Sequence, residues 1–244
     1  MNRIGLASLC LLALAGCADT GATARADCDT DNDAAAIVAC TKIIESGSAS
    51  QAAKAAAYRR RGAAHLEQRA FKKVLADYTQ AIRLQPNNAG DHFSRGLAYA
   101  GLTQNSPAIA ELSRAIQLDK TSAEVYFERG RISRRVGQLA PALRDFSQAI
   151  RLRANYDEAY DYRAWTHYQM RRPAPGLADI NKAIAIAPNQ IDYYRTRAHI
   201  LEALGRRQAA IDDYRRILRD RPLDQGAEAG LMRLRAVRPP VRLR

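Results

Sequence analysis

Apolar residues recur along most of the chain with the three- and four-residue spacing of amphipathic helices. From residue 55 to residue 224 they form stretches of about 13 residues, separated by short breaks, and this spacing predicts helices. Long alternating runs of β-branched residues are absent, and the 14 Gly and 9 Pro are sparse, which argues against a sandwich or a barrel. The expected fold class is therefore all-α.

The helical pattern repeats every 34 residues without insertions. The five repeats span residues 55–88, 89–122, 123–156, 157–190 and 191–224. The fourth place of each repeat holds Tyr58, His92, Tyr126, Tyr160 or Tyr194. The eighth place is always small, at Gly62, Gly96, Gly130, Ala164 and Ala198. Small residues let two helix backbones approach, and aromatic residues fill the grooves beside them.

This pattern resembles the tetratricopeptide repeat (TPR), a pair of antiparallel helices in 34 residues. The resemblance covers all five repeats and implies a TPR solenoid, a right-handed superhelix of helix-turn-helix repeats. One helix pair cannot bury its apolar face alone, so neighbouring repeats stabilise each other. Residues 33–54 are expected to form an N-terminal half-repeat helix and its connection, and residues 225–244 a capping helix and a basic tail.

Residues 1–16 are predicted to be a signal peptide. Arg3 precedes an apolar run, residues 4–15, that is shorter than the roughly 20 residues of a membrane-spanning helix. Leu14-Ala15-Gly16-Cys17 resembles a bacterial lipobox, which implies lipidation of Cys17 and a lipoprotein on the periplasmic side of the outer membrane. The alternative is cleavage after Ala24-Arg25-Ala26, which would release a soluble periplasmic protein.

The four cysteines can be assigned from this export signal. Cys10 would leave with the signal and Cys17 would carry lipid at the start of a linker, residues 17–32. Cys28 and Cys40 then remain as an even pair in an oxidising compartment and are predicted to form a disulfide. Loop-closure entropy gives such a bond a stabilisation of about 3 kcal/mol.

The chain carries 38 Lys+Arg against 25 Asp+Glu, a net charge of +13. A basic, Arg-rich chain suits nucleic acid, but an exported protein does not meet the genome. One place is arginine in all five repeats, at Arg61, Arg95, Arg129, Arg163 and Arg197. Sixteen residues later stand Asp77, Glu111, Asp145, Asp179 and Asp213. We predict a structural ladder of Arg–carboxylate pairs rather than a ligand site.

No known catalytic or metal-binding motif occurs in the sequence. The HExxH, GxSxG and Walker motifs are missing, as is any Cys/His spacing typical of metal sites. His65, His92 and His167 stand where the repeat has aromatic residues and are expected to pack. We therefore expect a non-enzymatic protein that uses no cofactor and no metal.

The TPR resemblance implies that the second, fifth, ninth and twelfth places of each repeat line a concave groove. The informative side chains there are Arg59, Phe93, Phe127, Arg131, Arg134, Asp161, Trp165, Tyr168, Arg195 and His199. Such a basic and aromatic groove is expected to bind an acidic or apolar segment of an envelope protein. Ala63 and Leu97 replace the Asn residues of the carboxylate clamp in chaperone-binding TPR proteins, so a chaperone C-terminus is not expected.

Two alternatives stay open at this point. Trp165 lies outside the consensus aromatic places and is a candidate interface anchor, although it could also pack against a neighbouring repeat. The Arg-rich faces could instead bind a polyanion, such as anionic lipid, lipopolysaccharide or peptidoglycan.

Overall fold

The computed structural model describes residue 28 and residues 33–235. Within that part of the chain the backbone forms twelve helices and no strand, so the predicted all-α fold class is confirmed. The helices fall into two compact units, which meet in sequence between Thr103 and Gln104 and are described separately below. The predicted signal peptide, the predicted lipidation site Cys17 and most of the predicted linker lie outside the described residues.

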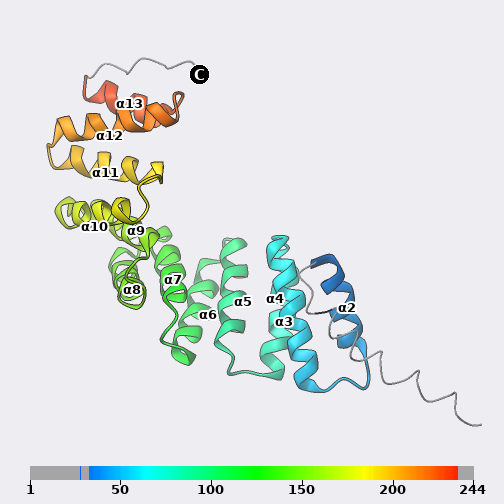
Figure 1. Cartoon of the computed structure of the whole chain (residues 1–244). Helices are drawn as coiled ribbons and strands as arrows, with labels where there is room; N and C mark the ends of the chain where they lie inside the picture. Colours follow the sequence, from blue (N-terminus) through cyan, green and yellow to red (C-terminus); the bar gives the residue numbers. More distant parts are fainter. Residues whose placement is uncertain (1–27, 29–32, 236–244) are drawn as a thin grey trace, which may run out of the picture. The chain divides into compact units, whose positions relative to one another are not determined.

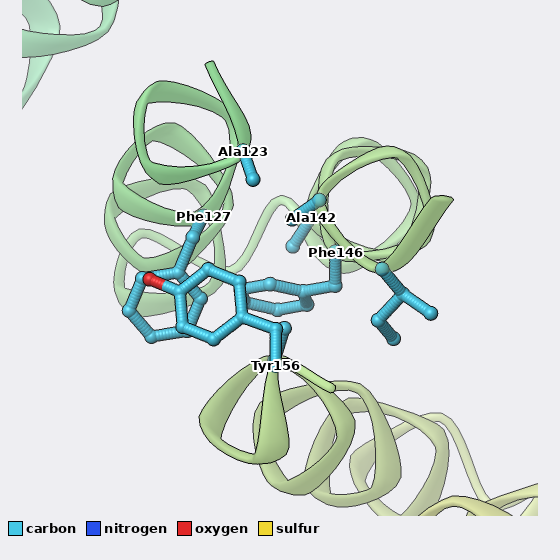
Figure 2. Packing of buried hydrophobic residues seen from close by; sticks show 8 residues of the cluster. Ala123, Phe127, Ala142, Phe146 and Tyr156 are labelled. Carbon is cyan, nitrogen blue, oxygen red and sulfur yellow. The ribbon is translucent and has the colours of Figure 1, made fainter. Parts of the chain in front are cut away.

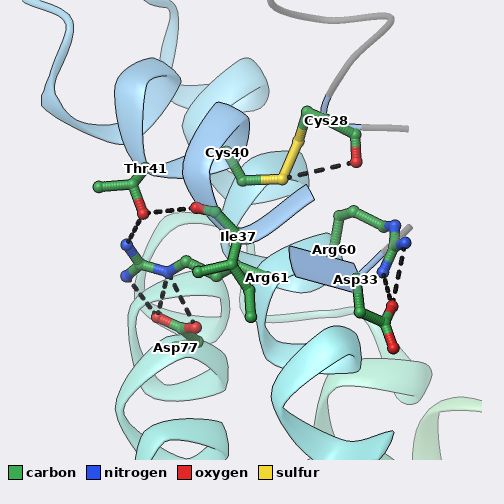
Figure 3. Close-up of a disulfide and its surroundings, with 8 residues drawn as sticks. All are labelled: Cys28, Asp33, Ile37, Cys40, Thr41, Arg60, Arg61 and Asp77. Atoms are coloured by element: carbon green, nitrogen blue, oxygen red, sulfur yellow. Dashed lines mark hydrogen bonds and ion pairs between the residues drawn. A yellow bond between two sulfur atoms is a disulfide. The ribbon is translucent and has the colours of Figure 1, made fainter. Parts of the chain in front are cut away.

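The N-terminal unit contains four helices, each of which packs on the next (Figure 1). They are α2 (Asp33–Glu45), α3 (Gln51–Glu67), α4 (Phe71–Leu84) and α5 (Ala89–Gly101). Ser50 caps α3 and Asn88 caps α5, because each side chain accepts a hydrogen bond from a backbone N–H of the first turn. Cys28 and Cys40 form the predicted disulfide beside α2 (Figure 3).

The C-terminal unit contains the other eight helices. They are α6 (Asn105–Leu118), α7 (Ala123–Arg135), α8 (Leu139–Leu152), α9 (Asp157–Gln169), α10 (Pro173–Ile186), α11 (Ile191–Ala203), α12 (Arg207–Asp220) and α13 (Gln225–Arg233). Helix pairs pack in chain order, and α9 also contacts both α7 and α11. The first helices of successive repeats therefore stand side by side and form one wall of this unit.

The turn between the two helices of each repeat has the same backbone conformation. The fifteenth residue has a positive φ in all five repeats, at Arg69, Thr103, Gly137, Arg171 and Gly205. Only two of these five are glycine, the residue that adopts this conformation at no steric cost. The turn is thus imposed by the packing of the helix pair rather than by local sequence.

The small eighth residue is explained by the aromatic side chain that faces it. A Cβ on Gly62 would lie 2.8 Å from the Tyr78 ring, and a Cβ on Gly130 would lie 2.9 Å from the Phe146 ring. Figure 2 shows Phe146 between α7 and α8, with Ala142 beside it and Tyr156 below. These contacts bury the apolar faces that the repeat pattern predicts.

None of the described helices is long and apolar enough to serve as a membrane span.

Candidate functional site

Four of the five predicted Arg–carboxylate pairs are present, and we call them the arginine ladder. In each rung a guanidinium binds both oxygens of the carboxylate sixteen residues later, with Nη2–Oδ1 distances of 2.6 to 2.7 Å. The rungs are Arg61–Asp77, Arg129–Asp145, Arg163–Asp179 and Arg197–Asp213. All four carboxylates are buried, with 3 to 7% exposure. Arg95 and Glu111 belong to different units, so this fifth pair stays a prediction.

Each rung also reaches the preceding helix pair. Nη1 of Arg61 donates to Thr41 at 2.8 Å (Figure 3), and the other three rungs donate to Ser113, Ser147 and Asn181 at 3.0 to 3.1 Å. These acceptors were not predicted from the sequence. They could have been, because one place of the first four repeats always holds a side chain that can accept a hydrogen bond: Thr79, Ser113, Ser147 and Asn181. Each of these four rungs therefore joins the two helices of its own repeat and also joins that repeat to the helix that precedes it.

The ladder also contacts the tyrosines of the fourth place. The guanidinium carbon lies 5.2 to 5.9 Å from the ring centroids of Tyr58, Tyr126, Tyr160 and Tyr194. Tyr194 donates to the carbonyl of Pro188, and a ring nitrogen of His92 lies 3.3 Å from the equivalent carbonyl of Pro86. The side chains of the fourth place thus have structural partners within the repeats.

A different arrangement is found on the wall made by α7, α9 and α11. A cavity of about 270 Å³ opens there, which we call the groove pocket. It is lined by Arg134, Asp161, Tyr162, Trp165, Asp192, Arg195, Thr196 and His199. Five of the ten predicted groove residues are thus brought together: Arg134, Asp161, Trp165, Arg195 and His199.

Trp165 forms the aromatic part of the groove pocket. Its ring lies 5.0 Å from the ring of Tyr168, a sixth predicted groove residue, and meets His199 edge-on at 5.7 Å. His199 is held from behind, where its Nδ1 lies 3.4 Å from the Tyr214 hydroxyl. Burial lowers the pKa of His199 below its ordinary 6.5, so its imidazole is neutral at pH 7.

Asp161 has an unusual electrostatic environment. Burial raises the pKa of Asp161 to about 6, and the negative charges of Asp192 and Asp157 act in the same direction. The Thr196 hydrogen bond and the charge of Arg134 oppose this rise. Its Oδ1 is excluded from solvent and has no hydrogen-bond partner among the described residues. Unlike the ladder carboxylates, this one forms no ion pair with an arginine in residues 33–235.

Three of the four predicted groove arginines are paired with carboxylates. Arg195 forms ion pairs with Asp192 and Asp224. Arg131 binds Glu128 on its own helix at 2.7 Å, and Arg59 binds both oxygens of the buried Asp91. The expected basic groove is therefore largely neutralised by the chain's own acids.

Arg134 differs from these three arginines. Its guanidinium lies 5.0 Å from the centre of the Tyr162 ring, and its Nη1 is 3.4 Å from the amide oxygen of Gln169. Its Nε is buried without a partner in the described part of the chain. Arg134 is thus the groove arginine whose charge is still available.

Solved structures of TPR proteins share this architecture. No family model matches the sequence, and no curated protein is similar to it in sequence. The C-terminal part of a TPR protein from Cytophaga hutchinsonii superposes with a TM-score of 0.70 at 18% identity, covering 87% of this chain and 84% of that one. The chain has the TPR fold.

Two further TPR structures agree with this assignment. YrrB, described as a TPR protein with an unusual peptide-binding site, matches with a TM-score of 0.68 at 16% identity, covering 79% of this chain and 97% of its own. MamA matches with a TM-score of 0.63 at 22% identity, covering 76% of this chain and 98% of its own. At these identities the likeness establishes the fold alone.

The structure contradicts the groove prediction at one residue, Phe127. Phe127 occupies a groove-lining place, yet it is only 6% exposed. Its ring lies 4.9 Å from that of Tyr156, beside which Figure 2 shows it, and 5.2 Å from that of Tyr162. Phe127 is a core residue and does not line the groove pocket.

Three other predicted residues do not line the groove pocket. Arg131 lies on α7, outside the pocket lining, and its guanidinium forms an ion pair with Glu128. Arg59 and Phe93 belong to the N-terminal unit, where Arg59 also donates to Gln85 at 2.8 Å and Phe93 is partly buried.

Proposed function

We propose that this chain is a non-enzymatic adaptor that binds a segment of a partner protein in the groove pocket. Its TPR fold supports an interaction role, because stacked first helices offer a surface on which extended or helical segments can bind. A TPR protein of similar fold, YrrB, is described as having a peptide-binding site.

The observation that carries this proposal is the composition of the groove pocket. Trp165 and Tyr168 form an aromatic surface, while Asp161 and Arg134 bring polar atoms that have no hydrogen-bond partner among the described residues. Unsatisfied buried polar atoms cost stability, about 1 to 3 kcal/mol each, and a ligand that bonds to them would offset this cost. Tryptophan and arginine are also the residues most enriched among interface anchors.

We further propose that the adaptor works in the bacterial cell envelope as a lipoprotein. This part rests on the apolar run of residues 4–15 and on the lipobox-like Leu14-Ala15-Gly16-Cys17. Labelling with radioactive palmitate in cells tests it. The label should depend on Cys17, should vanish in Cys17→Ser, and should be sensitive to globomycin. An unlabelled wild-type protein in the periplasm would favour cleavage after Ala26.

Crosslinked capture from envelope fractions tests the adaptor role. Wild type should recover partner proteins that Trp165→Ala does not recover. Tyr99→Ala, on α5 of the N-terminal unit, is a matched aromatic control and should recover the same partners as wild type. Circular dichroism of both variants would exclude unfolding. If wild type and Trp165→Ala recover the same proteins, the groove pocket is not the binding site.

Polyanion binding is a second candidate, favoured by the exposed arginines at the turns within repeats. Arg171 and Arg172 are exposed between α9 and α10, and Arg206 and Arg207 are exposed at the start of α12. Each base near an anionic surface adds about 1 kcal/mol, and salt screens this attraction. Binding to anionic vesicles that is lost at high salt and in Arg171→Ala/Arg172→Ala, but kept in Trp165→Ala, would support this function.

A further inference from the structure

We propose that the groove pocket recognises an uncharged amide group of the partner segment, with Arg134 donating to its oxygen and Asp161 accepting from its nitrogen. This inference rests on the proposed function, because it names the chemical group that the adaptor would bind. An amide of this kind belongs either to an Asn or Gln side chain or to the peptide backbone.

The charges that line the groove pocket point to a neutral ligand. Arg195 and Asp192 neutralise each other across 2.7 Å, and Arg195 also pairs with Asp224. The remaining charges are Arg134 on α7 and Asp161 on α9, which are opposite in sign. A ligand carboxylate would meet the charge of Asp161, and a ligand ammonium would meet that of Arg134. Like charges at close range are repelled.

The two atoms without hydrogen-bond partners are one donor and one acceptor, which is what an amide group needs to form hydrogen bonds at its oxygen and at its nitrogen. Arg134 Nε is a donor without an acceptor, and Asp161 Oδ1 is an acceptor without a donor in the described part of the chain. An amide offers one strong acceptor and at least one N–H donor. Both atoms are shielded from solvent, so small rotations of the two side chains would accompany binding.

The aromatic residues favour the same ligand. Trp165 and Tyr162 line the pocket, and the planar face of an amide can pack against such rings without a charge. The pocket volume of about 270 Å³ accommodates the aliphatic stem of a Gln side chain together with its amide. The guanidinium carbon of Arg134 lies 5.0 Å from the centre of the Tyr162 ring, and both side chains line the cavity.

The titratable groups around Asp161 make this ligand testable by pH. They are Arg134 on α7, Asp157 on the same helix as Asp161, and Asp192, Arg195 and His199 on α11. With its pKa raised to about 6, Asp161 is ionised at pH 7.5 and protonated at pH 5.0. Amide binding should weaken on acidification, because charge-assisted hydrogen bonds are the stronger ones. Carboxylate binding would instead tighten, since acid removes the repelling charge.

The experiment begins with random peptides displayed on phage, selected on the full chain at pH 7.5. Peptides that bind wild type but not Trp165→Ala are then synthesised without tryptophan. Their affinities are measured by fluorescence of Trp165, the single Trp of the chain. The same titrations are repeated at pH 5.0 and on Asp161→Asn, with Asp220→Asn, on the neighbouring α12, as the matched control.

The expected result is a common Asn or Gln, or a common requirement for one backbone N–H. Replacing that Asn or Gln by Ala, or methylating that backbone nitrogen, should cost about tenfold in affinity. The two substitutions distinguish a side-chain amide from a backbone amide. Binding to wild type and to Asp220→Asn should weaken about threefold to tenfold at pH 5.0, whereas Asp161→Asn should lose this pH dependence.

Three results would overturn the inference. Selected peptides that require an Asp or Glu and bind more tightly at pH 5.0 would show that the pocket takes a carboxylate. Peptides that require Lys or Arg would show that it takes a cation. Both results would leave the adaptor function in place. If no selected peptide depends on Trp165, the proposed function and this inference fail together.

Discussion

In the arginine ladder each aspartate accepts hydrogen bonds from two nitrogens of one arginine, while in the groove pocket Asp161 meets no arginine of the described part of the chain at ion-pair distance. The Asp145 oxygens, for example, lie 2.9 and 2.7 Å from Nε and Nη2 of Arg129. Asp161 instead keeps one oxygen without a partner among the described residues. Both carboxylates lie on helices of the same C-terminal unit, so the difference comes from their neighbours and not from the fold class.

The first kind of carboxylate stabilises the fold, whereas the second kind lowers the stability of the folded protein. A buried carboxylate that binds an arginine through both oxygens holds two helices together. Removing either partner leaves the other charge without its counter-ion, which is destabilising. A buried carboxylate without a partner lowers stability, and natural proteins keep such groups mainly where binding or catalysis needs them. Removing a charge from the ladder should therefore lower the free energy of unfolding, and removing the Asp161 charge from the pocket should raise it.

The largest effect is expected from breaking a central rung. Arg129→Leu leaves Asp145 buried, 5% exposed, without its arginine. The free energy of unfolding should fall by about 2 to 4 kcal/mol, somewhat less than for a fully buried pair because Arg129 itself is partly exposed. Urea denaturation followed by circular dichroism measures this change, and peptide affinity of the folded variant should be unchanged. Unchanged stability with lost binding would make the ladder a ligand site.

Loss of the disulfide should weaken the first rung without touching the central ones. Cys40 is buried and precedes Thr41, which accepts from Arg61 and so joins α2 to the ladder (Figure 3). Because the bond closes a loop with a sequence separation of 12, Cys28→Ser/Cys40→Ser should cost about 3 kcal/mol in the N-terminal unit. Hydrogen exchange should accelerate in α2 and stay unchanged in α11. Equal acceleration in both helices would contradict this.

Asp161→Asn should have the opposite sign and raise stability. Because the pKa of Asp161 is raised to about 6 in the folded protein, against 3.8 ordinarily, wild type loses stability as the pH rises through that window. The asparagine avoids this loss, so the variant should gain about 1 to 3 kcal/mol at pH 8 and almost nothing at pH 4. Thermal unfolding at both pH values measures it.

The control for this variant is Asp145→Asn, which replaces a ladder carboxylate by the same amide. It should lower stability at pH 8, because it removes the charge that Arg129 binds. If both asparagine variants destabilise the protein equally, Asp161 is a structural carboxylate, and the proposed contrast between ladder and pocket is wrong.

Repetition in the sequence was enough to predict the ladder. The side-chain pair recurs in the sequence of all five repeats, and it has the same geometry in the four rungs described above because these repeats share one backbone conformation. The acceptors Ser113, Ser147 and Asn181 carry the same signal and could have been included. The helix pairs and their fold class follow from the same regularity.

The groove pocket could be predicted only in part, because its residues differ from repeat to repeat. Phe127 and Asp161 occupy the same place in successive repeats, but Tyr156 and Tyr162 cover Phe127 while Asp161 borders a cavity. Arg59 occupies this place too and is bound by Asp91, an acid that no other repeat has there. The place in the repeat determines the position of a residue on the backbone. Whether its side chain can contact a ligand depends on neighbouring residues that differ from repeat to repeat.

The smallest effect is expected for Arg131→Leu, which tests the edge of the pocket. Arg131 is partly exposed and pairs with Glu128 three residues earlier on α7, and such a pair contributes about 0.2 to 0.5 kcal/mol. Urea midpoints should hardly move, and affinity for a selected peptide should stay within about twofold, since Arg131 does not line the cavity.

Arg134→Leu, one helical turn along α7, is the matched comparison. It removes the groove arginine that has no carboxylate partner in the described part of the chain, so it should weaken the same peptide about tenfold. Trp165 fluorescence titrations measure both variants. Equal losses in Arg131→Leu and Arg134→Leu would mean that the bound segment continues along α7 beyond the cavity. The wider basic groove predicted from sequence would then describe the binding surface better than the pocket does.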